Sequence, residues 1–115
     1  MALRDDLLEL EQGFWTQGAD YYRAHLDDHV LVAFGGMASV MSRDAVVSTV
    51  HGNRWNSPEI AAKGFLEPAP GVALLTYAAR ATKQDGTAYA ATVTSGYARR
   101  GEDWKMVFHQ QTPVG

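Results

Sequence analysis

The last third of the chain places the strongest constraint on the fold. Residues 72–112 contain three long segments rich in Val, Thr, Tyr and Phe, separated by short polar stretches at 84–87 and 100–103. Each stretch contains a glycine, Gly86 or Gly101, that can adopt the positive φ of a hairpin turn. The pattern predicts three antiparallel strands joined by two hairpins. Strands of about ten residues twist and curl, so the sheet should offer a concave face.

The N-terminal segment is expected to form a helical hairpin. Apolar side chains recur at helical spacing and predict a first helix that ends before Gly18; the members of this stripe are Leu3, Leu7, Leu10 and Phe14. Residues 19–26 repeat the pattern over two turns. We therefore expect a second, shorter helix there, ended by the acidic pair Asp27 and Asp28.

The middle of the chain predicts one strand, one helix and a further strand. Residues 29–34 are apolar and favour a short strand, whereas residues 37–41 allow a loop or a short strand. Ser42 is a good N-cap for a third helix, with His51 at its end and Gly52 just beyond it. Another strand is expected at 59–67, before a turn rich in Pro and Gly.

The order of these elements predicts the fold class. Helix, helix, strand, helix and then four strands indicate an α+β fold in which helices cover one face of an antiparallel sheet. The 115 residues suffice for one hydrophobic core, so we expect a single domain over residues 1–115.

Composition argues against several classes of partner. Apolar residues make up 46% of the chain and charged residues 20%, which is typical of a soluble protein. The net charge of −3 and the scattered basic residues argue against nucleic acid. The absence of cysteine removes disulfides and thiolate metal sites. The first residues are charged every few positions, unlike a signal peptide or a membrane span, so a cytoplasmic location without membrane association is the default expectation.

Short motifs along the whole chain resemble a known family. They are FW at 14–15, Tyr22, FGGM at 34–37, LLTY at 74–77, TSGYARR at 94–100 and WKMVFHQQTP at 104–113. With these motifs the chain resembles the SnoaL-like, often uncharacterised, bacterial branch of the nuclear transport factor 2-like (NTF2-like) superfamily. The resemblance implies a cone, in which a curved antiparallel or mixed sheet wraps around a long N-terminal helix and encloses a cavity, usually in a homodimer. Relatives of this shape include ketosteroid isomerases, polyketide cyclases, dehydratases, epoxide hydrolases and association domains, so the fold alone selects no function.

His109 is the candidate catalytic residue. Histidine titrates near neutrality and partial burial can tune it, which suits an acid or a base. The alternative is a structural histidine satisfied by a neighbouring hydroxyl or carbonyl. Alternation along the last strand places His109 on one face with Lys105, Val107 and Gln111, and places Trp104, Met106, Phe108 and Gln110 on the other. The pattern does not identify the concave face.

The expected ligand site is an apolar pocket with a few polar groups. Its predicted lining residues are Trp15, Tyr22, Met37, Trp55, Tyr77, Ser95 and Gln111. The large aromatic side chains could equally belong to the core. No metal site is predicted, because the spacing of His25 and His29 fits no zinc motif. No cofactor is expected either, since the chain has no phosphate-binding or dinucleotide-binding loop.

Two functions from different classes follow. The first is a homodimer, associated through the sheet, that binds a small apolar organic molecule in the cone and carries out isomerase-, cyclase- or dehydratase-type acid–base chemistry. The second is an association module with a vestigial pocket. A buried carboxylate or histidine facing a hydroxyl would favour the first function, and a collapsed apolar interior would favour the second.

Overall fold

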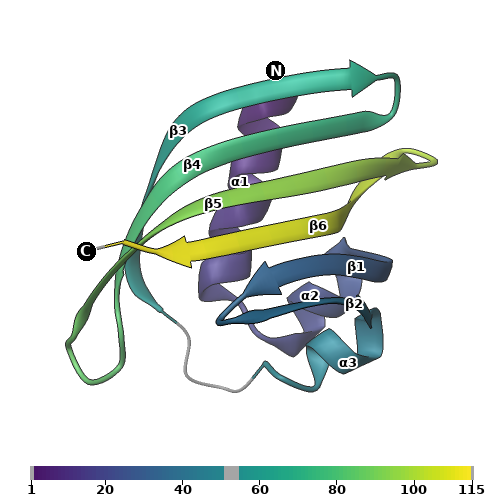
Figure 1. Cartoon of the computed structure of the whole chain (residues 1–115). Helices are drawn as coiled ribbons and strands as arrows, with labels where there is room; N and C mark the ends of the chain where they lie inside the picture. The colour runs from purple at the N-terminus through teal and green to yellow at the C-terminus, as the bar shows by residue number, and fades with distance from the viewer. Residues whose placement is uncertain (1, 51–54, 115) are drawn as a thin grey trace.

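The structure, a computed structural model, describes residues 2–50 and 55–114 and consists of three helices and six strands within those ranges (Figure 1). In chain order they are α1 (Leu3–Thr16), α2 (Ala19–His25), β1 (Leu26–Phe34), β2 (Met37–Ser42), α3 (Arg43–Val47), β3 (Asn56–Ala69), β4 (Val72–Thr82), β5 (Ala88–Arg100) and β6 (Asp103–Pro113). None of the described helices is both long and apolar enough to cross a membrane.

The strands form one mixed sheet in the order β2-β1-β6-β5-β4-β3. All neighbours are antiparallel except β1 and β6, which run parallel. The predicted α+β class is confirmed, and the predicted element order is matched roughly. The difference is β2, which realises the short-strand alternative for residues 37–41 and pairs with β1 as a hairpin.

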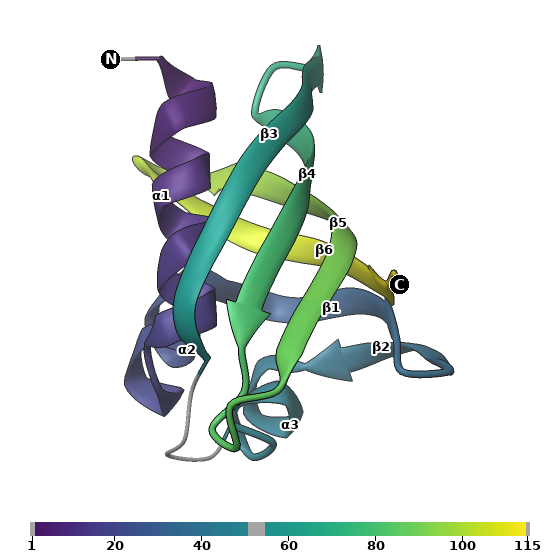
Figure 2. The ribbon, with the colours of Figure 1, turned by 90° about the vertical axis from the view of Figure 1, so that its left-hand side faces the viewer.

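The two predicted hairpins are present in the C-terminal part of the chain, where they join β4 to β5 and β5 to β6. Gly86 and Gly101 have φ values of +87° and +66°, a region that L-residues with side chains rarely adopt. The strands that these turns join contain 11, 13 and 11 residues. Their length lets the sheet curl into the concave surface seen from the side in Figure 2.

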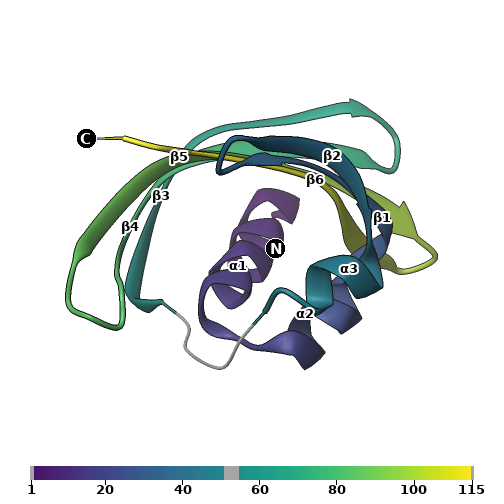
Figure 3. The ribbon, with the colours of Figure 1, turned by 60° about the horizontal axis from the view of Figure 1, so that its bottom comes forward.

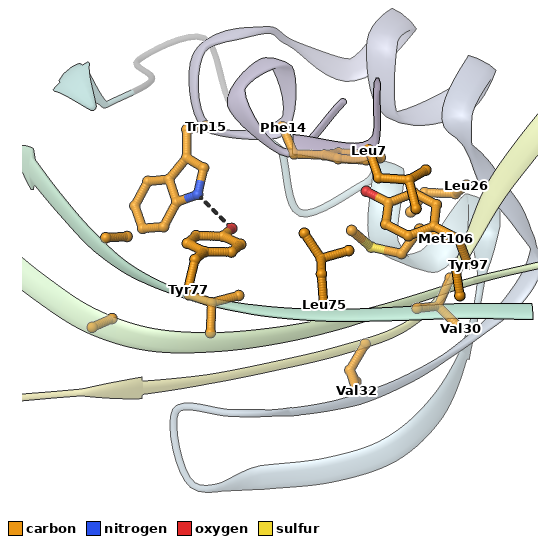
Figure 4. Close-up of a cluster of buried hydrophobic side chains, with 14 of the residues drawn as sticks. Leu7, Phe14, Trp15, Leu26, Val30, Val32, Leu75, Tyr77, Tyr97 and Met106 are labelled. Carbon is orange, nitrogen blue, oxygen red and sulfur yellow. Dashed lines mark hydrogen bonds between the residues drawn. The ribbon is translucent and has the colours of Figure 1, made fainter. Parts of the chain in front are cut away.

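Helix α1 lies in the concavity of the sheet, and α2 and α3 lie together at one end of it (Figure 3). The predicted apolar stripe faces the sheet, because Leu7 and Phe14 are buried. Trp15 is also buried, and Figure 4 shows these side chains packed against residues of β4, β5 and β6. The core is therefore a helix against the inner face of the sheet.

Helix α3 begins where the sequence predicts but is short. The Ser42 hydroxyl accepts a hydrogen bond from the Ala45 N–H at 3.1 Å, so Ser42 is the N-cap. The hydroxyls of Ser48 and Thr49 then bond to carbonyls three residues back, a pattern that competes with helix continuation. The predicted positions of His51 and Gly52 lie outside the described residues.

A β-bulge at Val107 corrects the predicted faces of the last strand. Gly96 pairs with Phe108 and Tyr97 pairs with Met106, so β6 has one extra residue opposite β5. The extra residue reverses the alternation across this point. Met106 therefore faces the concave side together with His109, whereas simple alternation placed them on opposite faces.

Candidate functional site

A buried carboxylate on α1 is the centre of a polar network inside the core. The side chain of Glu11 is fully buried, and three hydroxyl groups donate hydrogen bonds to it. Tyr77 and Ser95 donate to Oε1 at 2.6 and 2.9 Å, and Tyr97 donates to Oε2. An ionised carboxylate accepts only, so three donors aimed at it provide the compensation that a buried charge requires.

The indole of Trp15 supports this arrangement from the other side. Its Nε1–H donates to the Tyr77 hydroxyl oxygen at 3.0 Å, shown as the dashed line in Figure 4. Because an indole N–H can only donate, the hydrogen of the Tyr77 hydroxyl is left for Glu11. Trp15 and Tyr77, both predicted to bind a ligand, are thus parts of the buried network.

The polar network continues from Ser95 to residues of the last strand, β6. Ser95 Oγ lies 3.0 Å from Nδ1 of His109. On the other side of the ring, His109 Nε2 lies 3.0 Å from Gln111 Oε1, and the Gln111 amide nitrogen donates to the Tyr89 hydroxyl at 2.8 Å. A continuous polar chain therefore links the carboxylate inside the core to His109 and Gln111.

His109 and Gln111 also line a cavity between the helices and the sheet. Its volume is about 200 Å³. The remaining described lining residues are mostly apolar: Phe14, Tyr22, Leu26, Val30, Val32, Phe34, Val46, Thr49, Val50 and Met106. The lining is therefore mostly apolar, and we call the hydrogen-bonded pair His109 and Gln111 its polar end.

Of the remaining predicted ligand-binding residues, some lie in or next to the cavity and others lie away from it. Tyr22 and Gln111 line the cavity, and Ser95 lies directly behind His109. Trp55 stacks on Tyr89, with ring centroids 4.6 Å apart, and is outside the described cavity lining. Met37 is also outside that lining and is 40% exposed at the start of β2.

Glu11 is the site residue that the sequence reasoning missed. It lies four positions after Leu7 and three before Phe14, which is the spacing of the apolar stripe itself. A carboxylate within such a stripe is a signal, since an acidic residue is almost never fully buried unless it is paired. The partners come from strands more than sixty residues away, and the sequence alone does not identify them.

The buried phenols of the network are held in their protonated form. Burial, together with the charge of Glu11, raises the pKa of Tyr77 and of Tyr97 well above its usual value. Tyr21, whose hydroxyl donates to the Leu10 carbonyl at 2.9 Å, has its pKa raised to about 12 for the same reasons. All three hydroxyls therefore remain hydrogen-bond donors over the physiological range.

The histidines and acids between α2 and β1 have other partners. The His25 ring packs on Tyr21, with centroids 4.2 Å apart, and burial lowers the pKa of this histidine. Asp27 accepts two hydrogen bonds from Arg100, at 3.0 and 2.9 Å. Within residues 2–50 and 55–114, no three His, Asp or Glu side chains are arranged to hold a metal ion.

The convex face of the sheet carries a second feature, an apolar row that crosses all six strands. Cross-strand pairing joins its members directly, and they are Leu66, Leu74, Gly96, Phe108, Leu31 and Val40. Leu66, Leu31 and Val40 are 58%, 50% and 62% exposed. We call these six residues the convex apolar row.

Because Gly96 has no side chain, its neighbours in the row, Leu74 and Phe108, can occupy the space above it. A Cβ atom at this position would lie 2.9 Å from Leu74 Cδ2 and 3.2 Å from Phe108 Cβ. The two large side chains therefore approach each other over the glycine. The centre of the row is packed, and its ends are open to solvent.

The fold of the chain is NTF2-like. An NTF2-like protein of unknown function from Prochlorococcus sp. NATL2A has a TM-score of 0.80 with it, at 16% identity over 100% of this chain and 95% of that one. An NTF2-like protein of unknown function from Shewanella oneidensis MR-1 has a TM-score of 0.74 at 11% identity, with 96% and 98% covered. No protein-family model matches the sequence, and no curated protein gives a significant match.

An association domain also shares the fold. The association domain of CaMKII from C. elegans has a TM-score of 0.68 at 12% identity, over 95% of this chain and 94% of that one. At these identities the similarity concerns the fold alone, and the function must be argued from the side chains.

Proposed function

We propose that this protein binds a small, largely apolar organic molecule with one polar group in the cavity beside His109. The observation that carries this proposal is the composition of the cavity: apolar walls around a polar end of His109 and Gln111, backed by Ser95 and the buried Glu11. Ligand sites in proteins commonly combine apolar walls with a few convergent polar groups. Among the bacterial NTF2-like proteins, the sequence motifs favour the SnoaL-like branch, with a cytoplasmic location.

The size of the cavity limits the ligand to about one ring. The volume of about 200 Å³ lies below the range of roughly 300–1,000 Å³ that is usual for drug-sized ligands. An engineered apolar cavity of about 150 Å³ in another protein holds benzene. A phenol, a cyclic alcohol or a cyclic ketone would match both the volume and the polar end.

The same geometry supports acid–base chemistry by His109. An imidazole hydrogen-bonded to a hydroxyl, which is in turn hydrogen-bonded to a carboxylate, is held in a fixed orientation at the polar end of the cavity. A carbonyl compound bound there would place an acidic C–H or an enol hydroxyl near the ring. Isomerisation, cyclisation and dehydration all require such proton transfer.

Binding is tested with a panel of one-ring probes. Phenol, cyclohexanol and cyclohexanone, added at millimolar concentration to the uniformly ¹⁵N-labelled protein, should shift amide signals of residues that line the cavity. Val46→Phe should fill part of the space and suppress the shifts, because Val46 is a half-buried lining residue. The matched control is Val72→Phe, at a strand position that is 37% exposed.

The panel has outcomes that contradict the proposal. If no probe shifts a residue of the cavity, or if Val46→Phe and Val72→Phe bind equally well, the cavity is not a ligand site. Acid–base chemistry requires in addition that His109→Gln lowers turnover of a bound carbonyl substrate without unfolding the protein.

We further propose that two copies associate through the convex apolar row. One small domain can cover only one face of its sheet with helices, and here that face is the concave one (Figure 3). The row is apolar across the whole width of the sheet, and a second copy would cover its exposed ends. Leu31→Lys should therefore produce a monomer in sedimentation equilibrium at micromolar concentration, whereas Glu67→Lys, at an exposed polar position of β3, should not. A wild-type protein that is already monomeric would contradict dimerisation.

The alternative function is association without ligand binding. It is favoured by the same apolar row and by the shared fold with an association domain. The two functions are separated by the probe panel and the sedimentation experiment together. A dimer whose cavity takes up none of the probes would be an association module.

A further inference from the structure

We propose that Glu11, acting through Ser95, fixes the position of the hydrogen on His109, so that Nδ1 always carries it and Nε2, paired with Gln111 until a ligand displaces the amide, is the nitrogen that accepts a hydrogen bond from a ligand. Glu11 is then a positioning residue. The inference deepens the proposed function and rests on it for the role of Nε2, but it can be tested without a ligand.

The chain of hydrogen bonds begins at a group whose hydrogen has a fixed position. The Trp15 indole is a donor only, and it occupies an acceptor position of the Tyr77 hydroxyl at 3.0 Å. The Tyr77 hydrogen therefore points to Glu11 Oε1, 2.6 Å away. This fixes Glu11 Oε1 as an acceptor.

Ser95 is the next link, and its single hydrogen decides the direction of the remaining bonds. The Ser95 hydroxyl lies 2.9 Å from the same Oε1 atom and 3.0 Å from His109 Nδ1. Because the carboxylate oxygen accepts, the Ser95 hydrogen is directed to Glu11. The Ser95 oxygen must then accept from Nδ1, which therefore carries a hydrogen.

This assignment holds in both charge states of the histidine. In the charged ring, Nε2–H donates to Gln111 Oε1, as the 3.0 Å contact allows. In the neutral ring, the Gln111 amide turns over, its nitrogen donates to Nε2 and its oxygen accepts from the Tyr89 hydroxyl. Nε2 alone gains and loses the proton, on the side of the ring away from Ser95.

A neutral site of this kind favours a particular ligand class. A ligand that displaces the Gln111 amide meets an Nε2 lone pair, which accepts a hydrogen bond, so the preferred polar group on the ligand is a hydroxyl, as in a phenol or an enol. A methyl ether of the same shape lacks the donor. Phenol should therefore bind more tightly than anisole, and this difference should depend on His109.

The test is the tautomer of His109 in the protein without ligand. Long-range ¹H–¹⁵N correlation spectra distinguish Nδ1–H from Nε2–H in a neutral imidazole, and His109→Gln identifies the signals by their loss. At a pH where the ring is neutral, we expect the Nδ1–H pattern, opposite to the tautomer that free imidazole side chains favour in water. An Nε2–H pattern in the wild-type protein would overturn the inference.

Two variants test the link to Glu11. Ser95→Ala removes the acceptor, and Glu11→Leu frees the Ser95 hydrogen to point at Nδ1; both should convert His109 to the Nε2–H form. The matched control is Thr94→Ala, which removes a hydroxyl from the opposite face of the same strand, where it donates to Thr76. The control should keep the Nδ1–H pattern.

The outcomes are separable from those of the ligand panel. If a folded Ser95→Ala protein retains the Nδ1–H pattern, Glu11 does not position His109, whether or not phenol binds. Should either variant fail to fold, the wild-type tautomer still decides the inference. Failure of all probes to bind, with the Nδ1–H pattern present, would remove the proposed function and leave the hydrogen-bond assignment.

Discussion

Met106 and His109 face the same cavity although they are three positions apart along β6. In a regular strand such residues point to opposite faces. The bulge at Val107 absorbs one residue and brings both side chains to the concave side. Strand β6 thereby contributes one residue of the apolar wall, Met106, as well as the polar pair His109 and Gln111.

The helix inside the sheet should account for much of the stability. Leu7→Ala and Phe14→Ala are each expected to lower the free energy of unfolding by about 2–5 kcal/mol, because both side chains are buried against the sheet. Glu9→Ala, on the exposed side of α1, should cost little. Denaturant melts that gave all three variants the same small effect would contradict the central position of α1.

The convex apolar row should tolerate no side chain at its centre. Gly96→Val is expected to destabilise by about 1–3 kcal/mol, since the new Cβ would lie 2.9 Å from Leu74 and 3.2 Å from Phe108. Thr92→Val, at an exposed position on the same face of β5, is the control. Equal melting temperatures for the two variants would show that Leu74 and Phe108 can move apart to make room for the new side chain.

The buried phenols should make the protein sensitive to alkali. The unfolded chain releases the Tyr77 and Tyr97 protons near pH 10, whereas burial and the charge of Glu11 hold their pKa values above that in the folded state. The stability they contribute is fully present below about pH 10 and is lost as the pH rises further. Tyr97→Phe should flatten this decline in urea melts, and an unchanged slope would contradict it.

A different pair should act at acid pH. Hydrogen bonds from Arg100 lower the pKa of Asp27 below its usual value of 3.8, so the stability that this pair contributes is present above about pH 4 and is lost as the pH falls through the lowered pKa. Asp27→Asn should remove that part of the loss of stability at acid pH. Burial lowers the pKa of His25, so a separate loss of stability begins as the pH falls below about 6.5. This loss should remain in Asp27→Asn. If Asp27→Asn lost stability at acid pH as steeply as the wild-type protein, the Asp27–Arg100 pair would not be the cause of that loss.

Local patterns predicted the elements well, because they depend on neighbouring residues. The apolar stripe through Leu7 and Phe14, the Ser42 cap and the turns at Gly86 and Gly101 all appear where expected. The α+β class followed from the order of these elements, and the NTF2-like fold was implied by the resemblance of the motifs.

The site was harder to predict, because it depends on register. Simple alternation along β6 separated Met106 from His109, since nothing in the local sequence marks Val107 as the residue that the sheet leaves unpaired. Glu11 was missed because its partners lie on β4 and β5. His109 was predicted as a candidate from its chemistry, and its link to Ser95 became visible only with the pairing of two strands.

The parallel pairing of β1 with β6 has a consequence for how the chain folds. Strand β6 is the only neighbour that joins the β1–β2 hairpin to the rest of the described sheet. Those contacts span about eighty residues, so the entropy of closing the chain must be overcome before they form. On a ribosome, the β1–β2 hairpin would join the sheet only after β6 emerges, and the cavity, which β1 and β6 both line, would be completed at that step.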